Sequence, residues 1–443
     1  MKTRRLSQIF AALVTFASFT LGLGMSAQAQ TESTLYNFPG GYIGGLPESD
    51  LIMDSAGNLY GTTLEGGGPP SKCGTSESSC GTVFELSPSS GGTWTETVLH
   101  SFSGDANGGR LFSGLVQDAA GNLYGTTTDG GNLSACVGGD YQGVGCGVVF
   151  KLSRDSAGHW KETVLYTFSG GADGAFPFAD LMLDSAGNIY GTTVYGGFMS
   201  GCAKLGCGVV FRLTRTTTGW HEAVLHSFGG NNVEGNYPSA LVQDASGNLY
   251  GTVLQGGAIS SSCESGCGMA FELSPTSSGP WTFTLIHSFT GGSDGANPSS
   301  SLTLDTAGNL FGVTQHGGAN SVGNTYKLSP SGSSWVETVI YNFTAVPGVV
   351  YPSGALHFDA AGNLYGASKF GGSGRECSSD GCGVVYKLSP SGGSWTETDL
   401  YSFTGTPVDG DSPNGVLRDA AGNLYGTASG GNPGYGDVFE VTP

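Results

Sequence analysis

Short runs of apolar and β-branched residues alternate with clusters of Gly, Pro, Asn and Ser along the chain from about residue 30 onward. Four kinds of run make up one unit, and examples of the four are residues 181–183, 59–63, 208–213 and 160–168. Runs of this length that lack a helical period and are bounded by turn-forming residues predict β-strands. We therefore expect each unit to form one antiparallel sheet of four strands, named a to d in chain order.

The turn between strands a and b identifies the repeat. Its sequence Asp-x-x-Gly-Asn suits a tight turn, because the Asp side chain accepts backbone N–H groups and Gly-Asn tolerates positive φ. The turn occurs seven times, beginning at Asp54, Asp118, Asp184, Asp244, Asp305, Asp359 and Asp419. One such sheet cannot bury both of its faces, whereas seven stacked around an axis can. The sequence therefore predicts an all-β, seven-bladed β-propeller of four-stranded blades, in which these aspartates are structural.

The two ends of the chain predict how the ring closes. The seventh strand c, residues 437–441, is followed by no strand d, whereas residues 31–38 have the pattern of a strand d and closely match residues 161–168. The N-terminal strand is therefore expected to complete the last blade. An open solenoid is the alternative, but it would leave an unpaired strand edge at each end.

The first 29 residues have the pattern of a secretory signal peptide. Lys2, Arg4 and Arg5 precede an apolar stretch from about residue 9 to residue 25, and Ala27-Gln28-Ala29 offers a small-residue cleavage site. No later segment approaches the roughly twenty apolar residues that a membrane helix needs. We expect residues 30–443 to form a single secreted or periplasmic domain, monomeric and without a membrane anchor.

Composition narrows the class of partner. The formal net charge is −19, only 12% of residues are charged, and no cluster of Lys and Arg interrupts the acidic balance. Such a chain repels phosphate backbones, so nucleic acid is not expected as a partner. The 79 Gly residues are expected in turns, since 23 Phe and 18 Tyr supply apolar surface for a core.

The ten cysteines fall into five local pairs, each between strand b and strand c of one unit. Units five and seven have shorter b–c connections and no Cys, so the pairs accompany long loops. This pattern predicts disulfides that staple these loops in an oxidising compartment. A zinc site is disfavoured because the loops lack Cys-x-x-Cys and nearby His. The expected pairs are Cys73/Cys80, Cys136/Cys146, Cys202/Cys207, Cys263/Cys267 and Cys377/Cys382.

The repeats resemble the GloVer (choice-of-anchor) tandem-repeat family of bacterial exported proteins. The family motifs Asp-x-x-Gly-Asn-Leu-Tyr-Gly-Thr-Thr and Gly-x-Val-Phe-x-Leu stand at residues 54–63 and 81–86, and the resemblance covers essentially all of residues 30–443. It implies an exported repeat protein but no particular activity. Members often carry a C-terminal sorting anchor, which we do not expect here because the sequence ends at Thr442-Pro443.

Connectivity places the b–c and d–a loops on the same face of the disc, and variable loops on a rigid scaffold often bind ligands. The residue before the Gly-Gly pair that ends strand b differs in every unit, which predicts a ring of ligand contacts near the axis. Free variation at an exposed position is the alternative. These residues are Glu65, Asp129, Tyr195, Gln255, His316, Phe370 and, in the last unit, Ser429. Asp50 and Asp180, just before strand a, are expected near the channel, either facing a ligand or simply solvated.

No motif for catalysis has the right context. His221 to His226 has one residue too many for a zinc-protease motif and lies in an expected strand. Asp409, Asp411 and Asn414 offer oxygen ligands, but their loop lacks the full ligand series for Ca²⁺, and an acidic turn is expected instead. We therefore expect no catalytic residue, metal or cofactor, and predict a non-enzymatic binding module on the b–c/d–a loop face for a glycan or another cell-surface molecule, with a glycan or a protein as the possible ligand. The alternatives are a metal- or carboxylate-dependent lyase or hydrolase with its site in the channel, and a structural envelope protein.

Overall fold

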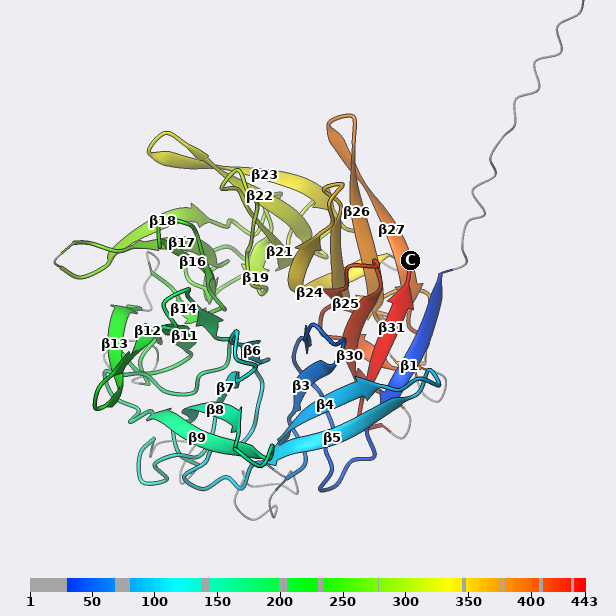
Figure 1. The fold of residues 1–443 in the computed structure, drawn as a ribbon. Helices are drawn as coiled ribbons and strands as arrows, with labels where there is room; N and C mark the ends of the chain where they lie inside the picture. Colours follow the sequence, from blue (N-terminus) through cyan, green and yellow to red (C-terminus); the bar gives the residue numbers. More distant parts are fainter. Residues whose placement is uncertain are drawn as a thin grey trace, which may run out of the picture.

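Seven antiparallel sheets succeed one another around a central axis in the computed structural model, as Figure 1 shows. The described residues are 30–443 except 68–79, 137–143, 199–201, 203–204, 230–233, 278, 345–347, 375, 378, 406–408 and 432–433. Residues 1–29, expected to be a signal peptide, lie outside this set. The predicted all-β, seven-bladed propeller is confirmed. No helix in the described part of the chain is long and apolar enough to cross a membrane.

Blades 1 to 3 each have four strands in chain order from the axis outward. Blade 1 consists of β2 (Ile52–Met53), β3 (Leu59–Thr63), β4 (Thr82–Pro88) and β5 (Trp94–Ser101). Blade 2 consists of β6 (Val116–Gln117), β7 (Leu123–Thr127), β8 (Val148–Arg154) and β9 (Trp160–Thr167). Blade 3 consists of β10 (Met182–Leu183), β11 (Ile189–Thr193), β12 (Val209–Thr216) and β13 (Gly219–Ser227).

Blades 4 and 5 have an inner strand in two segments, both paired with the same strand b. Blade 4 consists of β14 (Asn236–Pro238), β15 (Val242–Gln243), β16 (Leu249–Gln255), β17 (Met269–Ser274) and β18 (Thr282–Ser288). Blade 5 consists of β19 (Ala296–Pro298), β20 (Thr303–Leu304), β21 (Leu310–His316), β22 (Asn324–Ser331) and β23 (Ser334–Asn342). Blade 6 consists of β24 (Val349–Phe358), β25 (Leu364–Gly371), β26 (Val384–Ser391) and β27 (Ser394–Ser402).

The seventh blade joins the two ends of the chain. It consists of β28 (Asp411–Pro413), β29 (Leu417–Arg418), β30 (Leu424–Gly430), β31 (Asp437–Thr442) and β1 (Thr31–Asn37). β1 pairs antiparallel with β31, from Thr31 opposite Thr442 to Asn37 opposite Asp437, and the blue and red strands lie side by side in Figure 1. The predicted closure by the N-terminal strand is confirmed.

The seven a–b turns are built alike. The Asp54 carboxylate accepts hydrogen bonds from the backbone N–H groups of Ala56 and Asn58 at 2.9 and 3.0 Å, and from the Tyr60 hydroxyl at 3.0 Å. Burial alone would raise the pKa of Asp54, but these bonds and that from the Asn58 amide lower it overall. The carboxylate is therefore fully used within the turn, which supports its predicted structural role.

Neighbouring blades are joined by aromatic pairs. The Phe that follows strand d of one blade meets an aromatic ring on strand c of the next, edge to face or tilted, at centroid distances such as 5.0 Å for Phe102–Phe150. Both rings are completely buried. The seven pairs run around the whole ring: Phe38–Phe84, Phe102–Phe150, Phe168–Phe211, Phe228–Phe271, Phe289–Tyr326, Phe343–Tyr386 and Phe403–Phe439.

A second ring of contacts lies nearer the outer edge. A Glu on strand d faces a Tyr or His on the preceding blade, as in His100 Nε2 and Glu162 Oε2 at 3.6 Å. Burial raises the pKa of Glu96, Glu162 and Glu222 to about 7. Blade 4 differs because Phe283 replaces the Glu, and its ring stacks on His226 with centroids 4.6 Å apart.

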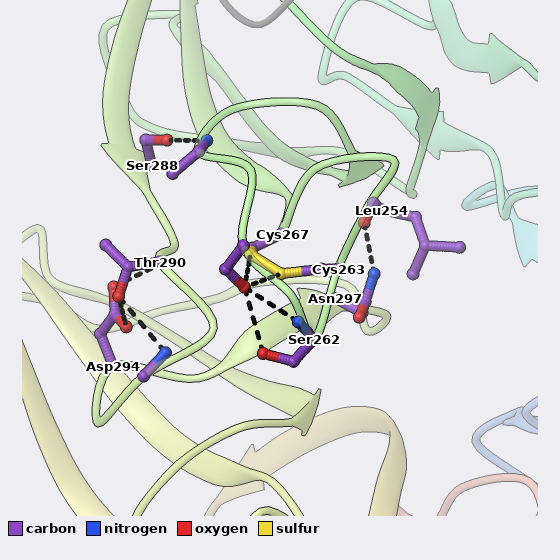
Figure 2. Close-up of a disulfide and its surroundings, with 11 residues drawn as sticks. Leu254, Ser262, Cys263, Cys267, Ser288, Thr290, Asp294 and Asn297 are labelled. Carbon is purple, nitrogen blue, oxygen red and sulfur yellow. Dashed lines mark hydrogen bonds between the residues drawn. A yellow bond between two sulfur atoms is a disulfide. The ribbon is translucent and has the colours of Figure 1, made fainter.

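Disulfides close the b–c loops. Four of the predicted pairs are present, with Cα atoms 5.2 to 5.5 Å apart: Cys136–Cys146, Cys202–Cys207, Cys263–Cys267 and Cys377–Cys382. Figure 2 shows the Cys263–Cys267 bond beside the d–a loop that contains Thr290 and Asp294. Cys80 is also disulfide-bonded, while Cys73 lies outside the described residues. The bonds are consistent with an extracellular or periplasmic location.

Removing residues 30–38 tests the ring closure. The truncated chain loses Phe38, which is completely buried against Phe84, and leaves the edge of β31 unpaired. We expect a marked fall in melting temperature and self-association, and Phe38→Ala alone should cost about 3–5 kcal/mol. Calorimetry and light scattering would be compared with a chain that lacks only residues 1–29. Equal melting of the two chains contradicts this account of closure.

The outer ring of Glu residues predicts that stability falls as the pH rises from acid to neutral. Because the pKa of these groups is higher in the folded than in the unfolded chain, their contribution is complete below the ordinary pKa of 4.5 and is lost as the pH rises through about 7. The melting temperature should therefore fall as the pH rises from about 4.5 to about 7, and the effect of these groups should level off above that range. Glu96→Gln should reduce that fall, whereas Glu264→Gln, at an exposed position, should not. An unchanged pH dependence in Glu96→Gln is the contrary result.

Candidate functional site

A cavity of about 690 Å³ lies at the axis, on the face that carries the d–a and b–c loops. Its walls come from two kinds of segment: the d–a loops that lead into each inner strand, and the last residues of several strands b. This is the face on which the connectivity predicted a site. The b-strand contribution consists of Thr128, Asp129, Val194, Tyr195, Leu254, Gln315 and Lys369.

The d–a loops are fixed by an unusual backbone conformation. Arg110 and Phe176, both in the cavity wall, have φ of 58° and 56°, which is rare for large residues. Their N–H groups donate to the carbonyl oxygens of Cys80 and Cys146 in the preceding blade, at 2.7 and 2.9 Å. The half-cystines thus position the cavity wall of the next blade. The same left-handed position occurs once per blade, at Leu46, Arg110, Phe176, Tyr237, Asn297, Tyr351 and Ser412.

Aromatic rings gather on the side of the cavity formed by blades 2 to 4. Phe112 and Phe178 are stacked with centroids 4.5 Å apart and planes 19° from parallel, and Phe178 is 48% exposed. The Arg110 guanidinium lies 5.3 Å from the Phe112 ring centroid. The hydroxyls of Tyr195 and Tyr237 are 3.4 Å apart. This wall offers flat apolar surfaces with polar groups at their edges.

The opposite side, formed by blades 5 to 7 and blade 1, is small and polar. The Lys369 ammonium lies 3.0 Å from the Glu48 carboxylate. Three buried polar atoms in this wall, Ser299 Oγ, Ser353 Oγ and Asn414 Oδ1, have no hydrogen-bond partner among the residues that the structure describes. Buried polar groups are normally paired, so these atoms indicate places where a ligand or water would bind.

Two aspartates stand where the inner strands begin. Asp180 accepts a hydrogen bond from the Gly114 N–H at 2.5 Å, and Asp50 accepts one from the backbone of Ala355. Burial is the main cause that raises the pKa of each to about 6, and the charge of Asp50 raises that of Asp180 further. The equivalent residues of the other blades are small: Gly114, Ala240, Ser301, Ala355 and Gly415. The two carboxylates therefore share a buried polar region at the axis.

Hydroxyl bonds between blades hold this region in place. The Thr62 Oγ1 of blade 1 donates to the Ser113 carbonyl of blade 2 at 2.9 Å, and the Thr427 Oγ1 of blade 7 donates to the Ser49 carbonyl of blade 1 at 2.8 Å. The latter bond crosses the junction at which the ring closes. A stable closure is thus a condition for the geometry around Asp50.

Four of the eight sequence-predicted site residues lie together in the cavity wall. They are Asp50, Asp129, Asp180 and Tyr195. Arg110 Nη1 lies 3.6 Å from Asp129 Oδ2, and burial raises the pKa of Asp129 to about 6 although the Arg110 charge opposes that rise. The other four, Glu65, Gln255, His316 and Phe370, are not among the lining residues. His316 is exposed and packs against the Tyr351 ring with centroids 4.8 Å apart. A ligand-binding role for all eight remains a prediction.

The strand register explains the variety at the predicted ring position. Each of these residues pairs antiparallel with the start of the innermost segment of its blade: Glu65 and Tyr195 form single bridges with Gly45 and Ala175, whereas Gln255, His316 and Phe370 pair with residues of the inner strands. The seventh member is Gly430 rather than Ser429, because Gly430 is the residue opposite Asp411. The rule of taking the residue before Gly-Gly gave Ser429 because Gly430 is itself the first glycine of the pair. The connection from Gly430 to Asp437 is one residue shorter than that from His316 to Asn324 in blade 5.

Sequence reasoning missed Phe112, Phe178 and the three unpartnered polar atoms. Phe178 and Phe112 carried one available signal: they stand two residues before Asp180 and Gly114, where the other units have Glu48, Pro238, Ser299, Ser353 and Pro413. The missing hydrogen-bond partners have no sequence signal. Among the described residues, no group of three or more His, Cys, Asp or Glu side chains is arranged to hold a metal ion.

Comparisons with known proteins agree with the fold. A family model described as the Gloeobacter/Verrucomicrobia repeat matches residues 22–203 and 195–379. No curated protein sequence matches the chain significantly. Among solved structures, a fungal alcohol oxidase of the AA5 family in complex with copper is 13% identical, with 93% of this chain and 77% of that chain covered and a TM-score of 0.53. At this identity the likeness shows the fold alone.

Two further structures are more distant. The Trichoderma reesei enzyme of family AA12 is 11% identical, with 94% of this chain and 96% of that chain covered and a TM-score of 0.43. A gluconolactonase from Xanthomonas campestris is 13% identical, with 67% and 81% covered and a TM-score of 0.37.

Proposed function

This chain belongs to the Gloeobacter/Verrucomicrobia repeat family, and we propose that it is an exported, non-enzymatic binding module that recognises a neutral glycan in the axial cavity. The observation that carries the proposal is the pairing of an aromatic wall with an opposite wall of unpartnered hydroxyl and amide groups. A sugar ring has the matching chemistry, with apolar C–H faces and hydroxyls at its edge.

The size and charge of the cavity support this ligand class. A volume of about 690 Å³ falls within the range of small-molecule sites, about 300–1,000 Å³. The acidic chain disfavours polyanions. Ser299 and Ser353 can each donate to and accept from sugar hydroxyls, and Asn414 Oδ1 can accept from one.

A carboxylate-dependent lyase or hydrolase is the second candidate function. One observation favours it: the pKa values of Asp50 and Asp180 are both raised to about 6, within reach of proton transfer near neutral pH. Groups of this kind can serve as a general acid and a general base if they reach a bound substrate. A structural envelope role has no comparable observation in its favour.

Binding is tested with a screen of neutral oligosaccharides on an array, followed by calorimetry. Phe178→Ala should weaken the affinity for a hit about tenfold, equivalent to about 1.4 kcal/mol, because it removes half of the stacked pair. Ser353→Ala should weaken it several-fold through a lost hydrogen bond. Phe198→Ala is the matched control, since Phe198 is 58% exposed but does not line the cavity. Tyr195 lines the cavity and His316 does not. Comparing Tyr195→Ala with His316→Ala therefore shows whether the binding site is confined to the lining residues.

The screen also has a result that opposes the proposal. If the Phe178→Ala and Ser353→Ala variants bind every hit as tightly as the unchanged protein, the cavity is not the glycan site. Affinity that collapses in moderate salt would indicate a charged ligand instead.

The enzyme alternative predicts turnover of a bound sugar. Product formation from any array hit, followed by mass spectrometry, should be reduced at least a hundredfold in Asp180→Asn if the carboxylate acts in general acid–base catalysis. Under the binding proposal, no product forms with either protein. Binding that persists without turnover distinguishes the two functions.

A further inference from the structure

The last blade carries two acidic residues at positions that are uncharged in every other blade. Asp437 begins strand c, where the other blades have Thr82, Val148, Val209, Met269, Asn324 and Val384. Asp411 begins the inner strand, where the other blades have Gly45, Gly109, Ala175, Asn236, Ala296 and Val350. Both departures from the repeat occur in the same blade, the one that closes the ring.

The sheet register places these two carboxylates on one face. Asp411 is opposite Gly430, and Asp437 is opposite Ala428 on the same strand β30. Paired residues and residues two apart share a face of an antiparallel sheet. The intervening positions are small, and a Cβ at Gly430 would collide with the Asp411 carboxylate while one at Gly410 would collide with that of Asp437. The two side chains therefore occupy the space above β30.

Asp437 lacks the partner that its polar counterparts have. In blade 1, the Thr82 hydroxyl lies 2.7 Å from that of Thr63, and in blade 5 Asn324 Oδ1 accepts from the Thr314 hydroxyl at 3.1 Å. In blade 7 the facing residue is Ala428, which has no donor. Asp437 is only 1% exposed, and its Oδ1 has no hydrogen-bond partner within the described ranges of the chain.

The charge around Asp437 is negative as well. The carboxylates of Glu32, Asp409 and Asp411 are close enough to Asp437 to act on it electrostatically. An isolated buried carboxylate is costly unless a cation or a proton neutralises it. Asp409 is already used, because it accepts hydrogen bonds from the Tyr401 hydroxyl at 2.6 Å and the Gly405 N–H at 2.8 Å.

We propose that Asp411 and Asp437 bind one Ca²⁺ ion in the closing blade. Ca²⁺ takes six to eight oxygen ligands in flexible geometry, so backbone carbonyls and water can complete a shell that contains only two carboxylates. Asn37 of β1, opposite Asp437, presents an amide on the same face. The ion would thus stabilise the junction between the N-terminal strand and the end of the chain. β31 adds one carboxylate, that of Asp437, to the oxygen ligands that the acidic loop offers in sequence.

The experiment measures the melting temperature of the purified protein in EDTA, in MgCl₂ and in CaCl₂, with calorimetry for stoichiometry. At a CaCl₂ concentration on the order of 1 mM, near the affinity of extracellular Ca²⁺ modules, we expect an upward shift and one site per chain. Mg²⁺ should give a smaller shift, because it demands a rigid octahedral shell. Absence of any Ca²⁺-dependent shift or heat overturns the proposal.

Three variants locate the site. Asp437→Asn should abolish the Ca²⁺ shift and, in EDTA, melt at or above the temperature of the unchanged protein, because it removes an unpaired buried charge. Asp411→Asn, at a less buried position, should also lose the shift and provides the test if Asp437→Asn does not fold. Asp294→Asn is the matched control.

The control is apt because Asp294 stabilises the d–a loop of blade 5 as Asp409 does that of blade 7. Its carboxylate accepts from the backbone and hydroxyl of Thr290 at 2.9 and 2.5 Å, as Figure 2 shows. That blade has Ala296 and Asn324 in place of the two acidic residues. A full Ca²⁺ shift in Asp437→Asn, or its loss in Asp294→Asn, places the ion elsewhere and overturns the proposal.

Discussion

The contact on which the structure depends is the aromatic pair between successive blades. Each Phe at the end of a strand d is buried against strand c of the next blade, not against its own. A single blade therefore leaves its largest apolar side chain exposed, and it gains stability only from its neighbours. In an open array the first and last blades would each lack one such partner. The pairing of Phe38 with Phe84 removes both deficits at once.

Closure in turn sets the geometry at the axis. The inner strands are short, and several are only two residues long. The few backbone hydrogen bonds to the neighbouring strand of the same sheet therefore hold them only weakly. Their positions are determined by bonds from neighbouring blades, such as that from Thr427 to the Ser49 carbonyl. The half-cystine carbonyls act similarly on the d–a loops. Distant parts of the chain therefore share in shaping one cavity.

The fold could be predicted from the sequence because its determinants are local and repeated seven times. A turn such as that at Asp54 forms its hydrogen bonds within itself. The extra strand at residues 31–38 matches the strand d that the last unit lacks. For the cavity, the sequence predicted only the face of the propeller on which it lies and some of the residues in its wall. Whether Glu65 or Asp129 lines it depends on the tilt of each strand end, and the stacking of Phe112 on Phe178 joins residues from different blades. Neither is encoded in a local pattern.

Departures from a repeat are informative when the structure shows what accompanies them. In blade 4 the exchange of Glu for Phe283 is matched by stacking on His226, so an apolar contact has replaced a polar one, and His226 Nε2 has no hydrogen-bond partner among the described residues. Ser353 and Asp437 also each have a buried polar atom without a partner in the described part of the chain, but Ser353 lines the cavity and the unpartnered atom of Asp437 belongs to a carboxylate. A buried group of this kind costs free energy in the isolated chain. A ligand in the cavity can offset this cost at Ser353, and a cation can offset it at the Asp437 carboxylate, which is the physical reason for assigning ligands to these two places.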